Sequence, residues 1–191
     1  MKDYVQSADT EMQAGPQGMM KVKQKNTWLA PSGFRQDQEL PFGKIIAAYD
    51  GKAGFLVTPQ GTMAMPPPVV TQVEGEVFRN LFALMLSDRD ATRKVNNTAP
   101  GMIEISGGEK HVAKVEFDAA TGLMKKLMYV EQQMGGAPQN VEESFSDWRE
   151  VGGLKIPFAI SITQGGNKLA DVKVQDFKIN SGVTAEELMK R

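Results

Sequence analysis

Hydrophobic and polar residues alternate along the first third of the chain, a pattern that predicts β-strands. Met20, Val22 and Trp28 occupy even positions, while lysines occupy the odd positions 21, 23 and 25. Successive side chains of a strand point to opposite faces, so this pattern is typical of a strand with one buried face. Similar runs over 3–12, 33–42, 44–49 and 52–59, joined by short turns, predict an antiparallel meander.

The spacing of the apolar residues changes after the prolines at 66–68. Between Val69 and Leu86 they recur at steps of three and four, which predicts one long amphipathic helix that ends near Ser87. An apolar helix face this wide must pack on another element. We expect it to lie on the concave face of the sheet.

Alternation returns in the second half of the chain, where Gly-rich turns separate the runs. The strands expected there are 102–106, 110–118, 123–133, 140–151, 154–163 and 168–180. In the last run Val172 and Val174 share one parity, whereas Phe177 and Ile179 share the other. A β-bulge near residues 175–176 would return all four side chains to one face.

Together these elements predict a mainly β (α+β) fold formed by residues 1–191 as a single domain. It would be a strongly curved antiparallel sheet, or half-open β-barrel, of about ten to eleven strands. One long amphipathic helix would pack on the concave face, and a short C-terminal helix would begin after Thr184, which resembles an N-cap.

Composition and charge exclude several partners and cofactors. The chain has 22 Lys and Arg against 23 Asp and Glu without a basic run, which argues against nucleic acid as a partner. It has no Cys, so it has neither disulfides nor thiolate metal sites. We expect no transmembrane segment, because no run of about 18 apolar residues occurs. The start lacks the order of a signal peptide and opens into strand-like sequence, so we expect an excised piece of a longer protein.

Catalytic constellations are absent from the sequence. His111 is the single histidine, which excludes a Ser-His-Asp triad or a two-His metal site built from this chain alone. The neighbouring pair Glu142 and Glu143 would point to opposite faces of a strand, as would other adjacent carboxylates. We therefore predict a protein that is not an enzyme, with no metal and no cofactor, and interpret His111 as a structural strand residue.

Apolar side chains supply the candidate functional site. Several methionines and aromatic residues stand where they could line a cavity between sheet and helix, and flexible Met suits adaptable apolar surfaces. Ordinary filling of the core is the alternative interpretation. From strand parity and helix face, the candidate ligand-binding residues are Phe55, Val57, Phe78, Phe82, Met85, Phe158 and Ile160.

The sequence also resembles known bacterial proteins. The stretches that carry the resemblance are GFRQDQELPFGKIIAAYDGKAGFLVTPQG (33–61), EVFRNLFALML (76–86), VEFDAATGLMKKLMY (115–129) and SFSDWREVGGLKIPFAISITQGGNKLADVKVQDFKINSGVTAEEL (144–188). The order of elements is similar to the LolA/LolB-like carriers that sort outer-membrane lipoproteins, in which a curved half-barrel holds acyl chains under a helical lid. The local sequence looks like a module found downstream of insulinase/pitrilysin-type peptidase domains, although the peptidase signature H-x-x-E-H is missing.

This resemblance implies a non-enzymatic module in the periplasm or otherwise outside the cytoplasm. Its ligand would be apolar, such as an acyl chain, lipid or lipoprotein, held between sheet and helix. The alternative is an accessory interaction domain of a zinc-peptidase-type or other envelope protein, with a filled interior and no ligand. Its partner would then be that envelope protein or a fused peptidase domain.

Overall fold

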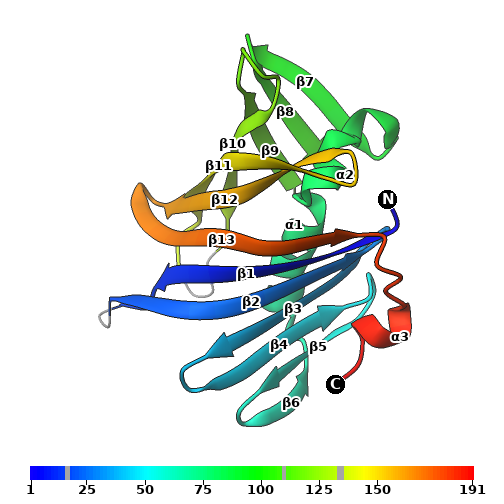
Figure 1. The fold of residues 1–191 in the computed structure, drawn as a ribbon, viewed down its shortest axis with the longest axis vertical. Coiled ribbons are helices and arrows are strands. Elements are labelled where there is room, and N and C mark those ends of the chain that lie inside the picture. Colours follow the sequence, from blue (N-terminus) through cyan, green and yellow to red (C-terminus); the bar gives the residue numbers. More distant parts are fainter. Residues whose placement is uncertain (16–17, 109–110, 133–135) are drawn as a thin grey trace.

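The computed structural model describes residues 1–191 except 16–17, 109–110 and 133–135. Its main feature is an antiparallel sheet of 13 strands in the order β6-β5-β4-β3-β2-β1-β13-β12-β11-β10-β9-β8-β7 (Figure 1). The first strand therefore pairs with the last. The strands of the first half are β1 (Asp3–Gln13), β2 (Met19–Leu29), β3 (Gly33–Leu40), β4 (Gly43–Tyr49), β5 (Gly54–Thr58) and β6 (Gly61–Ala64). Those of the second half are β7 (Arg93–Ala99), β8 (Met102–Gly107), β9 (His111–Phe117), β10 (Met124–Glu131), β11 (Gln139–Val151), β12 (Leu154–Gln164) and β13 (Asn167–Ile179).

A helical segment connects the two edges of this sheet. It consists of α1 (Pro67–Phe78), α2 (Leu81–Met85) and the 3-10 helix η2 (Ser87–Arg89), and it leads from β6 to β7. Because β6 and β7 are opposite edge strands, the segment has to cross one face of the sheet, and Figure 1 shows α1 behind the central strands. On that face Val73 of α1 packs with Tyr49 and Met65 in a buried cluster.

The sheet has 13 strands rather than the ten or eleven expected, because the alternation rule misses both edges. Strand β6 is exposed at all four of its residues, and in β7 only Arg93 is partly buried. A strand with no buried face has no hydrophobic alternation to detect. The other eleven strands correspond to the expected runs; Lys110 and Gln133, at the ends of two of those runs, lie outside the described residues.

The prediction of one long amphipathic helix from Val69 onward is wrong, because this segment forms two helices. Helix α1 ends at Phe78 and α2 begins at Leu81, and between them Asn80 has a non-helical backbone with φ −49° and ψ 129°. The Asn80 side chain accepts hydrogen bonds from the backbone N–H groups of Phe82 and Ala83, so it caps α2. The apolar spacing continues through the break because both helices face the same sheet.

The β-bulge expected in the last strand is confirmed. Ser7 pairs with Asp176 and Ala8 pairs with Val174, so Gln175 is the extra residue. Val174 is 4% exposed and Phe177 9%, which shows that the bulge returns both side chains to the buried face.

The short C-terminal helix α3 (Ala185–Leu188) is confirmed, with Thr184 and Glu187 forming a complete capping box. Leu188 is buried against the sheet at Gly33, where a Cβ atom would lie 2.8 Å from the Leu188 Cδ2 atom. On the same side Met189 packs against the buried Ile46, Ala48 and Phe55. Because Tyr49 of β4 packs on α1 while Ala48 packs near α3, the two helices cover opposite faces of the sheet.

Candidate functional site

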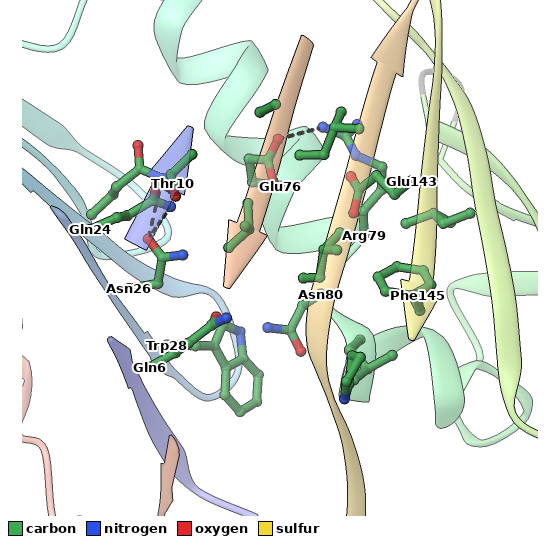
Figure 2. Close-up of a pocket in the computed structure, with 18 of the residues that line it drawn as sticks. Gln6, Thr10, Gln24, Asn26, Trp28, Glu76, Arg79, Asn80, Glu143 and Phe145 are labelled. Carbon is green, nitrogen blue, oxygen red and sulfur yellow. Dashed lines mark hydrogen bonds and ion pairs between the residues drawn. The ribbon is translucent and has the colours of Figure 1, made fainter. Parts of the chain in front are cut away.

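A cavity of about 430 Å³, here called the central cavity, lies between the sheet and the helical segment. Figure 2 shows the side chains that line it converging from both walls. One wall, the amide wall, consists of Gln6, Gln24, Asn26, Gln36 and Gln38 from β1, β2 and β3. The opposite wall is apolar and includes Leu127, Val141, Phe145, Ile160, Ile162 and Val172 from β10 to β13. Helices α1 and α2 and the turn between them contribute Glu76, Arg79, Asn80, Leu81 and Phe82.

The amide wall is cross-linked by its own hydrogen bonds. The amide oxygen of Asn26 accepts from Gln24 at 3.0 Å and from Gln36 at 3.2 Å, and the Thr10 hydroxyl donates to Gln24 at 3.5 Å. These residues were not among the candidates from the sequence. Their signal is that Gln24 and Asn26 share strand parity with the buried Val22 and Trp28, so polar side chains stand where an ordinary core would have apolar ones.

A chain of charged and aromatic groups lines another part of the central cavity. The Nη2 atom of Arg79 donates to the Oε1 atom of Glu76 at 2.8 Å, and the guanidinium lies over the Tyr129 ring, 3.7 Å from its centroid. The Tyr129 hydroxyl in turn donates to Glu143 at 2.9 Å. Figure 2 shows Glu76, Arg79 and Glu143 grouped on one side of the cavity, across from the amide wall.

Burial changes the acidity of this group. Burial and the charge of Glu76 together raise the pKa of Glu143 to about 7, although the hydrogen bond from Tyr129 and the charge of Arg79 act to lower it. Burial and the charge of Glu76 also raise the pKa of Glu131. For Arg79, burial acts to lower the pKa, but Glu76 and the neighbouring acidic groups together raise it, so the guanidinium stays charged.

Two buried N–H donors at this site have no acceptor among the described residues: the Nε1 atom of Trp28 and the Nε atom of Arg79. Trp28 as a whole residue is 7% exposed, and the side chain of Arg79 is 9% exposed. A buried donor without an acceptor typically costs about 1–3 kcal/mol. Both residues line the central cavity, although the two nitrogen atoms are themselves buried.

A second, apolar pocket of about 390 Å³ adjoins the central cavity. The two share Trp28, Leu81, Phe82 and Met124, so they meet on either side of α2. The other lining side chains of this apolar pocket include Met85, Leu86, Trp148 and Leu154. Met85 is 53% exposed and Leu86 48%, which places large apolar side chains at its rim.

The structure brings some of the candidate residues together and separates others. Phe82 and Ile160 line the central cavity, and Phe82 and Met85 line the apolar pocket. Phe158 is buried beside them with Ile156, Val174 and Phe177.

The remaining candidates lie away from both hollows. Phe78 packs in the core under β8 to β11, with the Arg93 guanidinium 4.5 Å from its ring centroid. Phe55 and Val57 are on the opposite face of the sheet, where they pack with Ile46, Ala48 and Met189. The neighbouring residue Leu56 faces the helical segment instead, and it packs with α1.

His111 begins β9, and its ring stacks on Phe78 with centroids 5.2 Å apart. Over the described residues, no group of three or more His, Cys, Asp or Glu side chains is placed to hold a metal ion. No helix within that part of the chain has the length and apolar character needed to span a membrane.

No family model matches the sequence, and no curated protein matches it. Solved structures, however, share the fold. A domain described as an outer membrane lipoprotein-sorting protein domain, from Vibrio parahaemolyticus, has a TM-score of 0.63 and 10% identity, covering 98% of this chain and 89% of that chain. A LolA superfamily protein from Nitrosomonas europaea has a TM-score of 0.63 and 8% identity, covering 100% and 90%. A DUF1329 family protein from Desulfovibrio piger has a TM-score of 0.59 and 8% identity, covering 98% and 89%.

The chain therefore has the fold of the LolA-like lipoprotein-sorting proteins, and the resemblance expected from the order of its elements is confirmed. At 8–10% identity the likeness concerns the fold alone. The function has to be argued from the residues of the two hollows.

Proposed function

We propose that the protein is a non-enzymatic carrier that binds an apolar ligand, such as an acyl chain, a lipid or a lipoprotein, between its sheet and its helical segment. The observation that carries this proposal is the apolar pocket beside α2, which continues into the central cavity through four shared residues. Volumes of about 430 and 390 Å³ are typical of small-molecule sites.

The positions of the side chains support a route for an apolar chain. Met85, Leu86 and Leu154 are exposed at the rim of the apolar pocket, whereas Phe82 and Met124 stand at its inner end. Burying apolar surface stabilises a complex by about 25 cal/mol per Å² before the losses of association are counted. An acyl chain that enters beside α2 would therefore gain the most binding free energy at the inner end of the pocket, against Phe82 and Met124.

The same hollows argue against the alternative function. An accessory interaction domain would have an interior filled by its own side chains, whereas this fold keeps two adjoining hollows under its helices. We also infer a location outside the cytoplasm, in the periplasm. That inference is supported by the shared fold with a domain described as an outer membrane lipoprotein-sorting protein domain.

Native mass spectrometry of the protein purified without detergent tests the proposal. We expect a discrete added mass in the lipid range after incubation with a bacterial lipid extract, and the added mass would identify the ligand class. A protein that stays bare before and after incubation would contradict the carrier function. The accessory interaction domain would then be the better hypothesis. The next experiment would identify the proteins that bind to the rim of the apolar pocket.

A further inference from the structure

The central cavity holds more negative than positive charge. Among the described residues that line it, the carboxyl groups are those of Glu76, Glu131 and Glu143, and the one basic side chain is that of Arg79. Arg79 already pairs with Glu76 at 2.8 Å. The hydrogen-bond donors to the other two carboxyl groups are uncharged: the amide of Gln164 donates to Glu131 at 3.1 Å, and the hydroxyl of Tyr129 donates to Glu143 at 2.9 Å. Two carboxyl groups of the cavity therefore bond only to neutral donors in the part of the chain that the structure describes.

Glu143 is the more unusual of these two, because it stands among apolar side chains. In the sheet it is directly opposite Leu127 of β10 and Ile162 of β12, and both of these residues also line the cavity. A carboxylate with such neighbours is poorly solvated, which is unfavourable unless a charged partner accompanies it. Glu143 is nevertheless partly accessible, and Figure 2 shows it beside the cavity, on the same side as Arg79. A ligand in the cavity can therefore reach its carboxyl group.

The Arg79 guanidinium does not neutralise Glu131 and Glu143. The pKa of each carboxyl group is raised, first by burial and then by the charge of Glu76, although Arg79 acts to lower both. The protonated form of each group is thus favoured beyond its ordinary range, because the site lacks positive charge. A bound cation would supply that charge, and the carboxyl groups would release protons to the solvent as it binds.

Arg79 also shows how this cavity holds a cation. Its guanidinium contacts the carboxylate of Glu76 and lies over the Tyr129 ring, 3.7 Å from the ring centroid. The face of an aromatic ring attracts a cation, and alkylammonium groups are typically bound by such rings. The amide wall adds carbonyl oxygens, which accept hydrogen bonds from an ammonium N–H. Other aromatic side chains that line the cavity are those of Tyr4, Trp28, Phe34, Phe145 and Phe177.

We propose that the central cavity binds a positively charged headgroup, so that the ligand is a cationic amphiphile, an alkylammonium group joined to an apolar chain. The ammonium group pairs with Glu143, while Glu131 and Glu76 attract it at longer range. The chain extends past Phe82, which the cavity shares with the apolar pocket. This inference rests on the proposed function, because the chain must occupy the pocket described above.

Three probes with the same ten-carbon chain test the inference: decylamine, decanol and decanoate. Each is titrated at pH 8, where decylamine is a cation and decanoate an anion, against protein that holds the neutral apolar dye N-phenyl-1-naphthylamine. Displacement of the dye is followed by fluorescence. We expect decylamine to displace the dye at concentrations about tenfold lower than decanol, which corresponds to one hydrogen bond to a charged group. Decanoate should be the weakest of the three, because its charge has the same sign as that of the cavity.

Two variants and a control assign this preference to the cavity. Glu143→Gln removes the charge but keeps an acceptor for the Tyr129 hydroxyl, so decylamine should bind about tenfold more weakly while decanol binds as before. Glu131→Gln should weaken decylamine less, since Glu131 acts at longer range. Glu142 is on the opposite face of β11 and does not line the cavity, so Glu142→Gln should leave the affinities of all three probes unchanged.

The pH dependence of binding distinguishes the charge of Glu143 from its packing. The pKa of Glu143 is about 7, so the group is ionised at pH 8 and mostly protonated at pH 5.5. Decylamine should therefore bind about tenfold more tightly at pH 8 than at pH 5.5, and decanol equally at both. The dependence should shrink in Glu143→Gln, where Glu131, whose pKa is also raised, still contributes. The other ionisable groups at the cavity are Tyr4, Glu76, Arg79 and Tyr129.

The outcomes separate this inference from the proposed function. Decanol or decanoate that displaced the dye at the same concentrations as decylamine, or at lower ones, would overturn the cationic headgroup while an apolar ligand site remains. Unchanged affinity of Glu143→Gln for decylamine, or an equal loss in Glu142→Gln, would also overturn it. If the dye and all three probes fail to bind, the carrier function itself is wrong, and the headgroup inference is lost with it.

Discussion

The amide nitrogen of Asn80 donates a hydrogen bond to the hydroxyl of Tyr4 at 2.9 Å, which joins the break between the two helices to the first strand of the sheet. The same side chain caps α2 through its oxygen. The Tyr4 ring stacks on Trp28 and Phe177 with centroids 5.9 and 4.9 Å apart. Asn80 therefore fixes where α2 starts and how it is oriented over the stacked rings of Tyr4, Trp28 and Phe177.

Replacement of Asn80 by Ala should destabilise the protein. It removes the cap of α2 and leaves the Tyr4 hydroxyl without its partner, which together should cost about 1–3 kcal/mol in the free energy of unfolding. Urea denaturation followed by fluorescence measures the change. Tyr4→Phe is the matched control, because it removes the same hydrogen bond but keeps the cap, and it should cost less than Asn80→Ala. An equal loss in both variants would show that the cap contributes nothing.

Most of the fold could be predicted because strands with one buried face show a periodic pattern of apolar residues. Strands with one buried face produce alternation, and the switch of parity between Val174 and Phe177 was enough to place a bulge near residues 175–176, where the structure has Gln175 as the extra residue. The edge strands β6 and β7 show no such pattern, since nearly all of their side chains are exposed. The break at Asn80 was missed because the apolar spacing continues through it. Asn80 caps α2 and also bonds to Tyr4, 76 residues away in the chain, and periodicity detects neither contact.

The site could be predicted less completely than the fold. The candidates Phe82, Met85 and Ile160 do line one or both hollows, because apolar side chains on the predicted helix and strands tend to point inward. Phe55 was assigned to the wrong side, since a strand covered on both faces gives no parity signal and α3 covers its face. The amide wall was missed for a different reason: polar residues are normally assigned to solvent, even where Gln24 and Asn26 share the parity of the buried Val22 and Trp28.

Asp3 ties the two ends of the chain together and should do so only while it is charged. Its carboxylate accepts hydrogen bonds from the backbone and hydroxyl of Ser181 and from the backbone of Gly182. Burial alone would raise the pKa of Asp3, but these hydrogen bonds outweigh it and lower the pKa. A lowered folded-state pKa gives stability that is present above the unfolded value and is lost as the pH falls through the folded one.

We therefore expect Asp3→Asn to destabilise the protein by about 1–3 kcal/mol at pH 7, with a smaller difference from the natural chain at pH 3. Urea unfolding at both pH values measures this. Asp9→Asn, on an exposed position of the same strand, controls for the loss of charge alone. A difference that stays constant with pH would contradict the role of the carboxylate.

Glu143 should act in the opposite direction. Burial and the charge of Glu76 raise its pKa from an ordinary 4.5 to about 7, so between these values the folded protein binds more protons than the unfolded chain. Stability from this group is complete below about pH 4.5 and falls as the pH rises through 7. Glu143→Gln should consequently stabilise the protein at pH 8, by about 1–3 kcal/mol, and the gain should vanish near pH 4.

The measurement for Glu143 is the free energy of unfolding across this pH range. Glu142→Gln removes a carboxylate from the opposite face of the same strand and controls for net charge, although it also breaks an ion pair with Lys126 at 2.9 Å. If Glu143→Gln stabilised the protein more at pH 4 than at pH 8, relative to the natural chain, the raised pKa of Glu143 would be refuted.

The apolar pocket beside α2 makes the last prediction, because its rim can be changed without disturbing the core. Met85 is 53% exposed and lines the pocket, so Met85→Asp should leave the protein folded while placing a charge where a ligand chain would enter. Met63, 49% exposed on β6, lines neither hollow, and Met63→Asp is therefore the matched control. Titration with N-phenyl-1-naphthylamine should show about tenfold weaker binding for Met85→Asp and unchanged binding for Met63→Asp, since a charge at an apolar rim opposes burial of the dye. Equal affinities in the two variants would mean that the dye, and by extension a ligand chain, does not pass between α2 and the turn that precedes Leu154.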